Sequence, residues 1–320
     1  MGVRLGVLDV GSNTVHMVAV DARNGGHPTP MSDWKTSLRL VELIDGDGAI
    51  DDKGIKRLAK AVAEAADLAN TLGCKEIMPF ATSAVRSATN SQDVLNAVEK
   101  ETGVRLEVLS GEDEARLTFL AVRRWYGWSA GRVTNLDIGG GSLELSTGSD
   151  ETPDVAISLD LGAGRLTHQW FDTDPPERKK VNLLRDYIDA ELVAPARQMR
   201  AYGAAGIAVG TSKTFRTLAR LTGAAPSAEG PYVKRTLTAP GLRQLIAFIS
   251  RMTAADRAEL EGISSDRSHQ IVAGALVAEA SMRALGLEQI EICPWALREG
   301  VILRRIDKGL DEIPQERKRP

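Results

Sequence analysis

Hydrophobic residues in the first part of the chain follow two alternating periods, those of strands and of helices. The apolar run at residues 3–9 predicts a buried strand, and residues 16–21 predict its hairpin partner. Apolar positions at helical spacing predict a helix from Asp51 or Asp52 to Leu72, and Gly73 suits the residue that follows a helix end. Further strands are expected at 36–43, 75–81 and 105–109, and further helices at 92–101 and from Ser110 to about Trp125.

The pattern restarts after the glycine-containing segment 127–131. Strands are expected at 132–137, 143–147, 154–159, 206–209 and 289–293, and helices from about Glu177, at 241–252, at 266–285 and at 295–307. Pro195 lies within the helix that starts near Glu177 and should kink or break it, because proline has no backbone N–H.

A chain of 320 residues exceeds the size at which a single core stops growing, so two domains are expected. The restart of the pattern places them at residues 1–128 and 129–320. The last helix, at about 296–310, is expected to be able to pack back on the first domain.

Nearly the same short motif occurs once in each predicted domain. Near the start, an apolar run leads into Asp9-Val10-Gly11-Ser12-Asn13-Thr14; later, another leads into Asp137-Ile138-Gly139-Gly140-Gly141-Ser142. Glycine lets the backbone approach a ligand closely, and successive N–H groups in a turn attract anions. The repetition predicts a duplicated fold that binds a phosphate chain between its halves.

The composition of the chain argues against some classes of binding partner. The 40 Lys and Arg against 43 Asp and Glu give a formal net charge of −3, which provides no global field for nucleic acid. Two cysteines far apart in the sequence favour a reducing compartment over a disulfide framework. Neither a signal peptide nor an apolar run long enough for a membrane span is indicated, so we expect a cytoplasmic protein that binds no membrane.

The second glycine turn carries the sharper chemical signal. Three adjacent glycines cost conformational entropy that a plain turn does not require, which favours anion binding at Gly139, Gly140, Gly141 and Ser142. Asp137 precedes this turn and Glu144 follows it. Carboxylates beside bound phosphate would repel it unless a cation intervenes, and Mg²⁺ is the usual one. A capping aspartate and a solvated glutamate are the alternative interpretation.

Three acidic residues, Glu112, Asp113 and Glu114, fall in the first turn of a predicted helix that Ser110 caps. The helix dipole alone would favour them there, or one of them serves as a general base. Arg86 follows a strand and is able to fork onto a phosphate, although a solvent-facing arginine is the more common outcome of such a pattern.

A third turn with hydroxyl groups, Gly210-Thr211-Ser212, lacks the spacing of a Walker A loop. Four scattered histidines without a cysteine cluster argue against zinc, and no G-x-S-x-G elbow occurs. The candidates therefore indicate phosphoryl transfer by positioning and metal electrostatics, without a covalent nucleophile.

These segments resemble the exopolyphosphatase/guanosine-pentaphosphate phosphohydrolase (Ppx/GppA) family, within the actin–sugar kinase–heat-shock chaperone superfamily. The matching segments occur in family order at residues 9–17, 81–86, 110–117, 137–144, 209–212 and 297–300. The resemblance implies an α/β fold of two ribonuclease-H-like (actin-like ATPase) domains with an active-site cleft between them. It also implies release of terminal phosphate from inorganic polyphosphate, or of the 5′ γ-phosphate from pppGpp, with Mg²⁺ or Mn²⁺.

The resemblance also assigns roles to residues. Glu114 matches the family's catalytic base, and Asp137 and Glu144 match its metal-associated acids. Positions that match its phosphate-contacting residues are Gly11, Ser12, Asn13, Thr14, Arg86, Gly139, Gly140, Gly141, Ser142, Gly210, Thr211 and Ser212.

The chain ends soon after the second predicted domain, whereas longer family members append a helical extension. We therefore expect a preference for short polyphosphate chains and low processivity. A homodimer is expected from the resemblance to the family and from the frequency of dimers among oligomers. A pppGpp 5′-phosphohydrolase uses the same machinery and remains the main alternative, with pppGpp or ppGpp as a substrate or an inhibitor. A sugar- or acetate-type kinase and a catalytically silent polyphosphate or alarmone sensor are further alternatives.

Overall fold

The computed structural model describes residues 2–23, 25–26, 28 and 30–310. Backbone contacts divide the chain into two compact units. The first unit comprises Met1–Leu109 and Arg298–Pro320, and the second comprises Ser110–Leu297. No helix in the described part of the chain is both long and apolar enough to cross a membrane.

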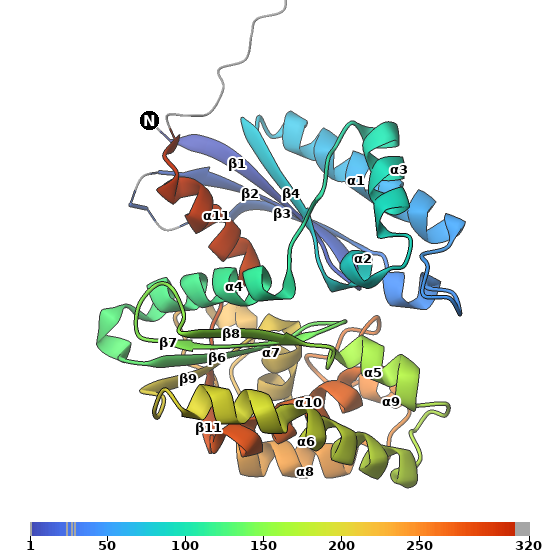
Figure 1. Cartoon of the computed structure of the whole chain (residues 1–320), viewed down its shortest axis with the longest axis vertical. Helices are drawn as coiled ribbons and strands as arrows, with labels where there is room; N and C mark the ends of the chain where they lie inside the picture. The colour runs from blue at the N-terminus through green and yellow to red at the C-terminus, as the bar shows by residue number, and fades with distance from the viewer. Residues whose placement is uncertain (1, 24, 27, 29, 311–320) are drawn as a thin grey trace, which may run out of the picture. The chain divides into compact units, whose positions relative to one another are not determined.

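The first unit is built on a mixed sheet with the strand order β3-β2-β1-β4-β5 (Figure 1). β1 (Val3–Val10), β2 (Thr14–Ala22) and β3 (Pro30–Ser37) run antiparallel, and β4 (Glu76–Ala81) and β5 (Glu107–Val108) continue the sheet in parallel with β1. The helical segments of this unit are η1 (Leu40–Leu43), α1 (Asp52–Thr71), α2 (Ser83–Ser87), α3 (Ser91–Thr102) and α11 (Leu297–Asp307).

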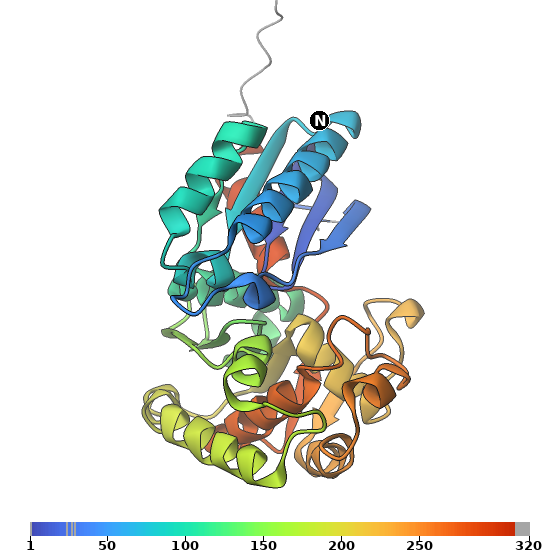
Figure 2. The same ribbon diagram turned by 90° about the vertical axis from the view of Figure 1, so that its right-hand side faces the viewer.

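One face of the first sheet packs on α1. Leu8, Val10, Val15 and Met17 of β1 and β2 share a buried cluster with residues of α1 such as Leu58. The helix α11 lies on the other face of this sheet, opposite α1 and α3 (Figures 1 and 2). Arg305 of α11 donates two hydrogen bonds to the Glu76 carboxylate, at 2.9 and 2.8 Å, and so fastens this helix to β4.

The second unit repeats the arrangement with the order β8-β7-β6-β9-β11-β10. β6 (Val133–Ile138), β7 (Leu143–Gly148) and β8 (Val155–Leu159) run antiparallel, and β9 (Ile207–Thr211) continues in parallel with β6. β11 (Gln289–Ile292) and β10 (Thr236–Thr238) complete the sheet. Its helical segments are α4 (Gly111–Tyr126), η2 (Trp128–Ala130), α5 (Ala163–Trp170), α6 (Arg178–Arg200), α7 (Ser212–Leu221), η3 (Ser227–Glu229), α8 (Ala239–Ile249), α9 (Ala254–Ala258) and α10 (Ile271–Leu285).

The two faces of the second sheet are covered by different helices. Leu136, Ile138 and Leu143 belong to the large cluster that includes α7 and α10. Val133 and Val209 pack instead with Phe119 and Val122 of α4 on the other face. The helix α4 therefore belongs to the second unit, whereas the sequence pattern placed it before a boundary at residue 128.

Several predicted elements require correction. The third strand covers Pro30–Ser37, and the expected strand at 36–43 is largely the short helix η1. The helix α10 begins at Ile271, after turns at 266–270. The helix α6 continues through Pro195, so the alternative of a break is wrong. The carbonyl of Glu191, which loses its helical partner there, belongs to an exposed residue and is accessible to water.

Candidate active site

The second glycine turn, residues 139–142, joins the antiparallel strands β6 and β7. The N–H of Gly139 donates to the carbonyl of Ser142 at 2.9 Å, which closes the turn directly beyond the last strand pair, Ile138 and Leu143. The turn is therefore a tight hairpin connection whose position is fixed by the register of two buried strands.

The segment that follows β8 holds this turn from one side. The carbonyl of Gly139 accepts from the N–H of Ala163 at 3.0 Å, and the carbonyl of Gly140 accepts from the N–H of Arg165 at 2.9 Å. The Arg165 side chain donates to the carbonyl of Gly141 at 2.9 Å. In a trans peptide the C=O and N–H point in opposite directions, so the N–H groups of residues 140, 141 and 142 point away from this segment. Three N–H groups on one side form a concavity of the kind that attracts anions.

Glycine is required in the segment behind the turn. A Cβ on Gly162 would lie 2.2 Å from the carbonyl carbon of Gly141 and 2.3 Å from the nitrogen of Ser142. A Cβ on Gly164 would lie 2.8 Å from Oε1 of Gln270 and 3.1 Å from the carbonyl oxygen of Gly140. The two backbones are thus in direct contact, which fixes the orientation of the turn.

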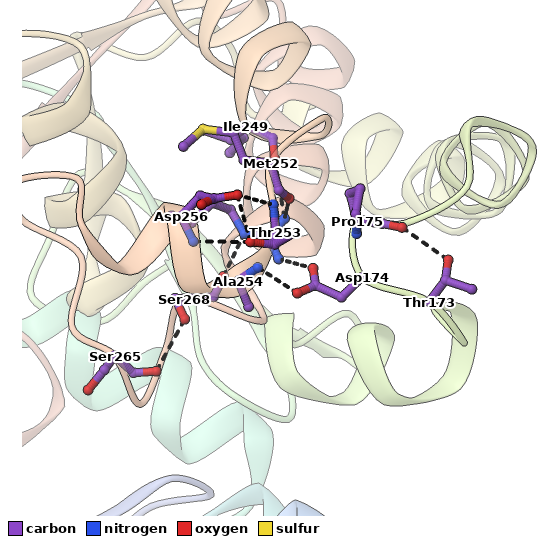
Figure 3. Close-up of polar contacts among 11 residues, drawn as sticks. Thr173, Asp174, Pro175, Ile249, Met252, Thr253, Ala254, Asp256, Ser265 and Ser268 are labelled. Carbon is purple, nitrogen blue, oxygen red and sulfur yellow. Dashed lines mark hydrogen bonds and ion pairs between the residues drawn. The ribbon is translucent and has the colours of Figure 1, made fainter.

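A buried arginine fixes the start of α10, which carries Gln270 toward this contact. Arg257 is 1% exposed, and it donates to the carbonyl of Ser268 at 2.9 Å and to Asp174 at 2.8 Å. Figure 3 shows Asp174 also accepting from the N–H of Ala254 in α9, at 2.5 Å. Asp174 therefore joins the loop before α6 to the helix α9, and Arg257 joins α9 to the loop before α10.

A row of polar side chains crosses the second sheet on the face that α4 covers. Thr211, Asp137, Glu144 and Ser158 are direct neighbours on β9, β6, β7 and β8. Thr211 donates from Oγ1 to Oδ2 of Asp137 at 2.6 Å, and Ser158 donates from Oγ to Oε1 of Glu144 at 2.9 Å. The cross-strand register therefore places two carboxylates side by side, each held by a hydroxyl donor.

Glu114 approaches this row from the first turn of α4. Ser110 caps the helix by accepting from the N–H of Asp113 at 3.0 Å, as the sequence predicts. Glu114 is 7% exposed and Glu144 is 4% exposed, so the alternative of a solvated Glu144 is wrong. Burial first, and then the charges of Glu114 and Asp137, raise the pKa of Glu144 well above its ordinary value. Burial also raises the pKa of Asp137, against the lowering effect of its bond from Thr211.

This carboxylate set is compatible with a hard divalent cation. Within the described ranges, no three or more His, Cys, Asp and Glu residues form a group arranged to hold a metal by themselves. Mg²⁺ does not need such a group, since it is commonly bound by one or two carboxylates together with water and phosphate oxygens. Asp137 and Glu144 fit that requirement, and a bound cation would relieve the repulsion that raises the pKa of Glu144.

The residues of the third predicted turn, 210–212, serve two different purposes. Gly210 lies inside β9, and a Cβ there would be 2.8 Å from the ring of Phe215, so this glycine serves packing. Ser212 begins α7 with a φ of 73°, and its buried hydroxyl has no hydrogen-bond partner among the described residues. Thr211 and Ser212 therefore remain candidates for ligand contact.

The first glycine turn, residues 11–14, has the same construction as the second. The N–H of Gly11 donates to the carbonyl of Thr14 at 3.0 Å. The segment after β3 again holds the turn: Leu40 donates its N–H to the carbonyl of Ser12, and Leu38 and Arg39 donate theirs to that of Asn13. The N–H groups of Asn13 and Thr14 therefore point away from that segment.

The helix α2 carries Ser83, which contacts the first turn, and Arg86, which the resemblance matched to a phosphate-contacting residue. The hydroxyl of Ser12 is hydrogen-bonded to that of Ser83, with 3.0 Å between the oxygens. Arg86 lies on α2 and donates to the carbonyl of Leu109 at 2.8 Å. The sequence reasoning missed Ser83 and Ser158. A signal for Ser83 was present, because Thr82-Ser83 and Thr211-Ser212 are the same dipeptide at the starts of α2 and α7.

Comparison with known proteins identifies relatives across nearly the whole chain. The sequence model of the Ppx/GppA phosphatase family matches residues 19–309. Proteins named exopolyphosphatase 1 from Mycobacterium tuberculosis and Mycobacterium bovis are 67% identical over 308 residues, which cover 96% of this chain and 90% of theirs. An uncharacterized protein from Streptomyces coelicolor is 43% identical over 96% of this chain and 91% of its own.

Solved structures show the same fold. An exopolyphosphatase from Cytophaga hutchinsonii aligns with a TM-score of 0.86 at 24% identity, over 95% of this chain and 98% of that one. A Ppx/GppA family member from Aquifex aeolicus aligns with a TM-score of 0.79 at 22% identity, over 97% and 99%. The prediction of an α/β fold with two actin-like domains is confirmed.

Proposed function

Because the chain belongs to the Ppx/GppA phosphatase family, we propose that it is an exopolyphosphatase that releases terminal orthophosphate from inorganic polyphosphate. The observation that carries this proposal is the 67% identity, over 308 residues, to mycobacterial proteins named exopolyphosphatase 1. The chemistry of the second unit supports it, since an anion-binding turn adjoins a set of buried carboxylates.

Each carboxylate is given a separate role. Glu114, the carboxylate that comes from a helix, is the proposed base that orients the attacking water and accepts its proton. Asp137 and Glu144 are the proposed ligands of Mg²⁺ or Mn²⁺. When bound, such an ion supplies positive charge to the phosphoryl oxygens during transfer.

The glycine turns are the proposed phosphate-binding groups. In the second unit, the N–H groups of residues 140–142 would stabilise the charge that develops on phosphoryl oxygens, with Thr211 and Ser212 nearby in sequence and sheet. In the first unit, the turn at residues 11–14 and Arg86 would bind further phosphate groups of the chain. We propose further that the protein is cytoplasmic and that it forms a homodimer. Light scattering on purified protein would test the homodimer.

The test is phosphate release in the presence of Mg²⁺ from short polyphosphate and from pppGpp, for wild type and Glu114→Gln. We expect release from polyphosphate, reduced by at least about 100-fold in the variant, because general-base catalysis contributes on that order. Glu112→Gln is the matched control, since Glu112 shares the helix turn but is exposed and paired with Arg116.

Three results would change the assignment. Release mainly from pppGpp would make the protein a guanosine-pentaphosphate phosphohydrolase. Activity that survives Glu114→Gln would move the base to another residue. No release from either substrate would contradict an enzymatic role and indicate a sensor.

A further inference from the structure

The two units place equivalent residue pairs at the ends of equivalent strands. In the second unit, Asp137 of β6 lies opposite Glu144 of β7, just before the glycine turn. In the first unit, Asp9 of β1 lies opposite His16 of β2 in the same relation to its own turn. The position of the second metal-associated carboxylate is thus taken by a histidine.

A helix covers each of these pairs and presents a charged residue from its first turn. In the second unit this helix is α4, which carries Glu114. In the first unit it is α11, which carries Arg298 as its second residue. Arg298 belongs to the motif Leu297-Arg298-Glu299-Gly300, to which no role has been given above.

Arg298 is fixed between the two paired residues. Its guanidinium is hydrogen-bonded to Nδ1 of His16, and the same guanidinium nitrogen lies 3.9 Å from Oδ2 of Asp9. The other ring nitrogen of His16, Nε2, lies 2.8 Å from Oδ1 of Asp33. A carboxylate can only accept, so the ring proton of a neutral imidazole is favoured on Nε2, which leaves Nδ1 as the acceptor for Arg298. Burial and the charge of Arg298 lower the pKa of His16 to about 4, which agrees with a neutral ring.

The charges of the two equivalent positions are therefore different. Asp137, Glu144 and Glu114 are three carboxylates that require an added cation before phosphate binds. Asp9, neutral His16 and Arg298 already contain both signs of charge. A phosphate oxygen at the first turn would therefore meet Asp9 with a guanidinium beside it.

We propose that Arg298 is the built-in cation of the first glycine turn: it neutralises Asp9, so that residues 11–14 bind a phosphate group without a metal ion. His16 and Asp33 position it. The identity of the phosphate chain as polyphosphate rests on the proposed function, whereas the charge compensation does not.

The experiment measures binding of sodium tripolyphosphate by isothermal titration calorimetry, with EDTA present to remove divalent cations. Arg298→Gln should weaken binding at least tenfold, because Asp9 then loses the nearby positive charge of Arg298. The double variant Arg298→Gln/Asp9→Asn should recover binding to within about threefold of wild type, because both charges are removed together. Arg305→Gln is the matched control on the same helix, and it should bind as wild type does, since Arg305 pairs with Glu76.

A second variant keeps the test decisive if Arg298→Gln does not fold. Asp9→Asn alone retains Arg298 and should bind tripolyphosphate several-fold more tightly than wild type. Unchanged binding in Arg298→Gln, no recovery in the double variant, or unchanged binding in Asp9→Asn would each overturn the proposal. Hydrolysis is not measured in this experiment. A protein that cleaves neither polyphosphate nor pppGpp would refute the proposed function. Its binding of tripolyphosphate would still test whether Arg298 compensates the charge of Asp9.

Discussion

Burial acts in opposite directions on the ionisable residues of the two units. His16 is cationic when protonated, so burial lowers its pKa, to about 4. Asp137 and Glu144 are anionic when deprotonated, so burial raises their pKa values. The cost of burying a charge therefore favours a neutral histidine in the first unit and makes the carboxylates of the second unit harder to ionise.

The histidine predicts a loss of stability in mild acid. Its pKa is 6.5 in the unfolded chain and about 4 in the native state, so the unfolded chain takes up the proton first as the pH falls. The free energy of unfolding should thus decrease between pH 6.5 and pH 4, by roughly 3 kcal/mol from this residue. Urea unfolding of wild type and His16→Gln across this range measures the effect.

The comparison isolates the histidine, because Asp137 and Glu144 are present in both proteins and cancel in the difference. Wild type should lose stability more steeply than His16→Gln below pH 6.5. Parallel curves for the two proteins would contradict a neutral, buried His16.

The contacts among the second unit's candidate residues follow from local motifs more directly than those in the first unit. Asp137 and Glu144 lie on either side of one turn, so their proximity follows from a hairpin. His16 and Arg298 are separated by 282 positions, and nothing in the local pattern of either residue indicates their contact. Long-range pairs of this kind depend on topology, which the hydrophobic periods do not specify.

At the scale of elements, the second glycine turn depends on the segment that supports it. The closest contact is at Gly162, where a Cβ would lie 2.2 Å from backbone of Gly141. Gly162→Ala must therefore displace the turn. We expect a loss of about 2–3 kcal/mol in unfolding free energy, as for other overpacked sites, and a loss of phosphate release beyond what this destabilisation explains.

Thermal unfolding and phosphate release, measured on the same preparations, test this prediction. Gly46→Ala is the control, since its φ is not positive and no atom lies within 4 Å of the added Cβ. A Gly162→Ala protein with native stability and activity would mean that the turn tolerates displacement.

Elements with a regular apolar period were predicted well, and those built from small or polar residues were not. The strands β1, β6 and β7 begin and end within one or two residues of their predicted bounds. The helix α7 was missed, because Thr214 and Thr217 occupy buried positions in it where a periodic pattern requires apolar residues. Threonine hydroxyls there bond to backbone carbonyls of Ile138 and Gly262, a pairing the sequence does not show.

At the scale of the whole chain, the second unit is a continuous segment and the first is not. The chain passes from the first unit to the second after Leu109 and returns at Arg298. The helix that follows β5 thus covers the second sheet, and the helix that follows β11 covers the first. Hydrophobic periodicity places a boundary only where a pattern restarts, which is why it predicted residue 128.

Fragments distinguish the two boundaries. A fragment of residues 110–297 retains α4, whose Phe119 and Val122 cover Val133 and Val209, and it should unfold cooperatively in urea. A fragment of 129–297 exposes that face and should not. In the same way, residues 2–109 alone lack α11 and the contact of Arg305 with Glu76, whereas 2–109 joined to 298–310 by a flexible linker should fold. Cooperative unfolding of 129–297 would instead favour the boundary at residue 128, and would make α4 part of the first domain.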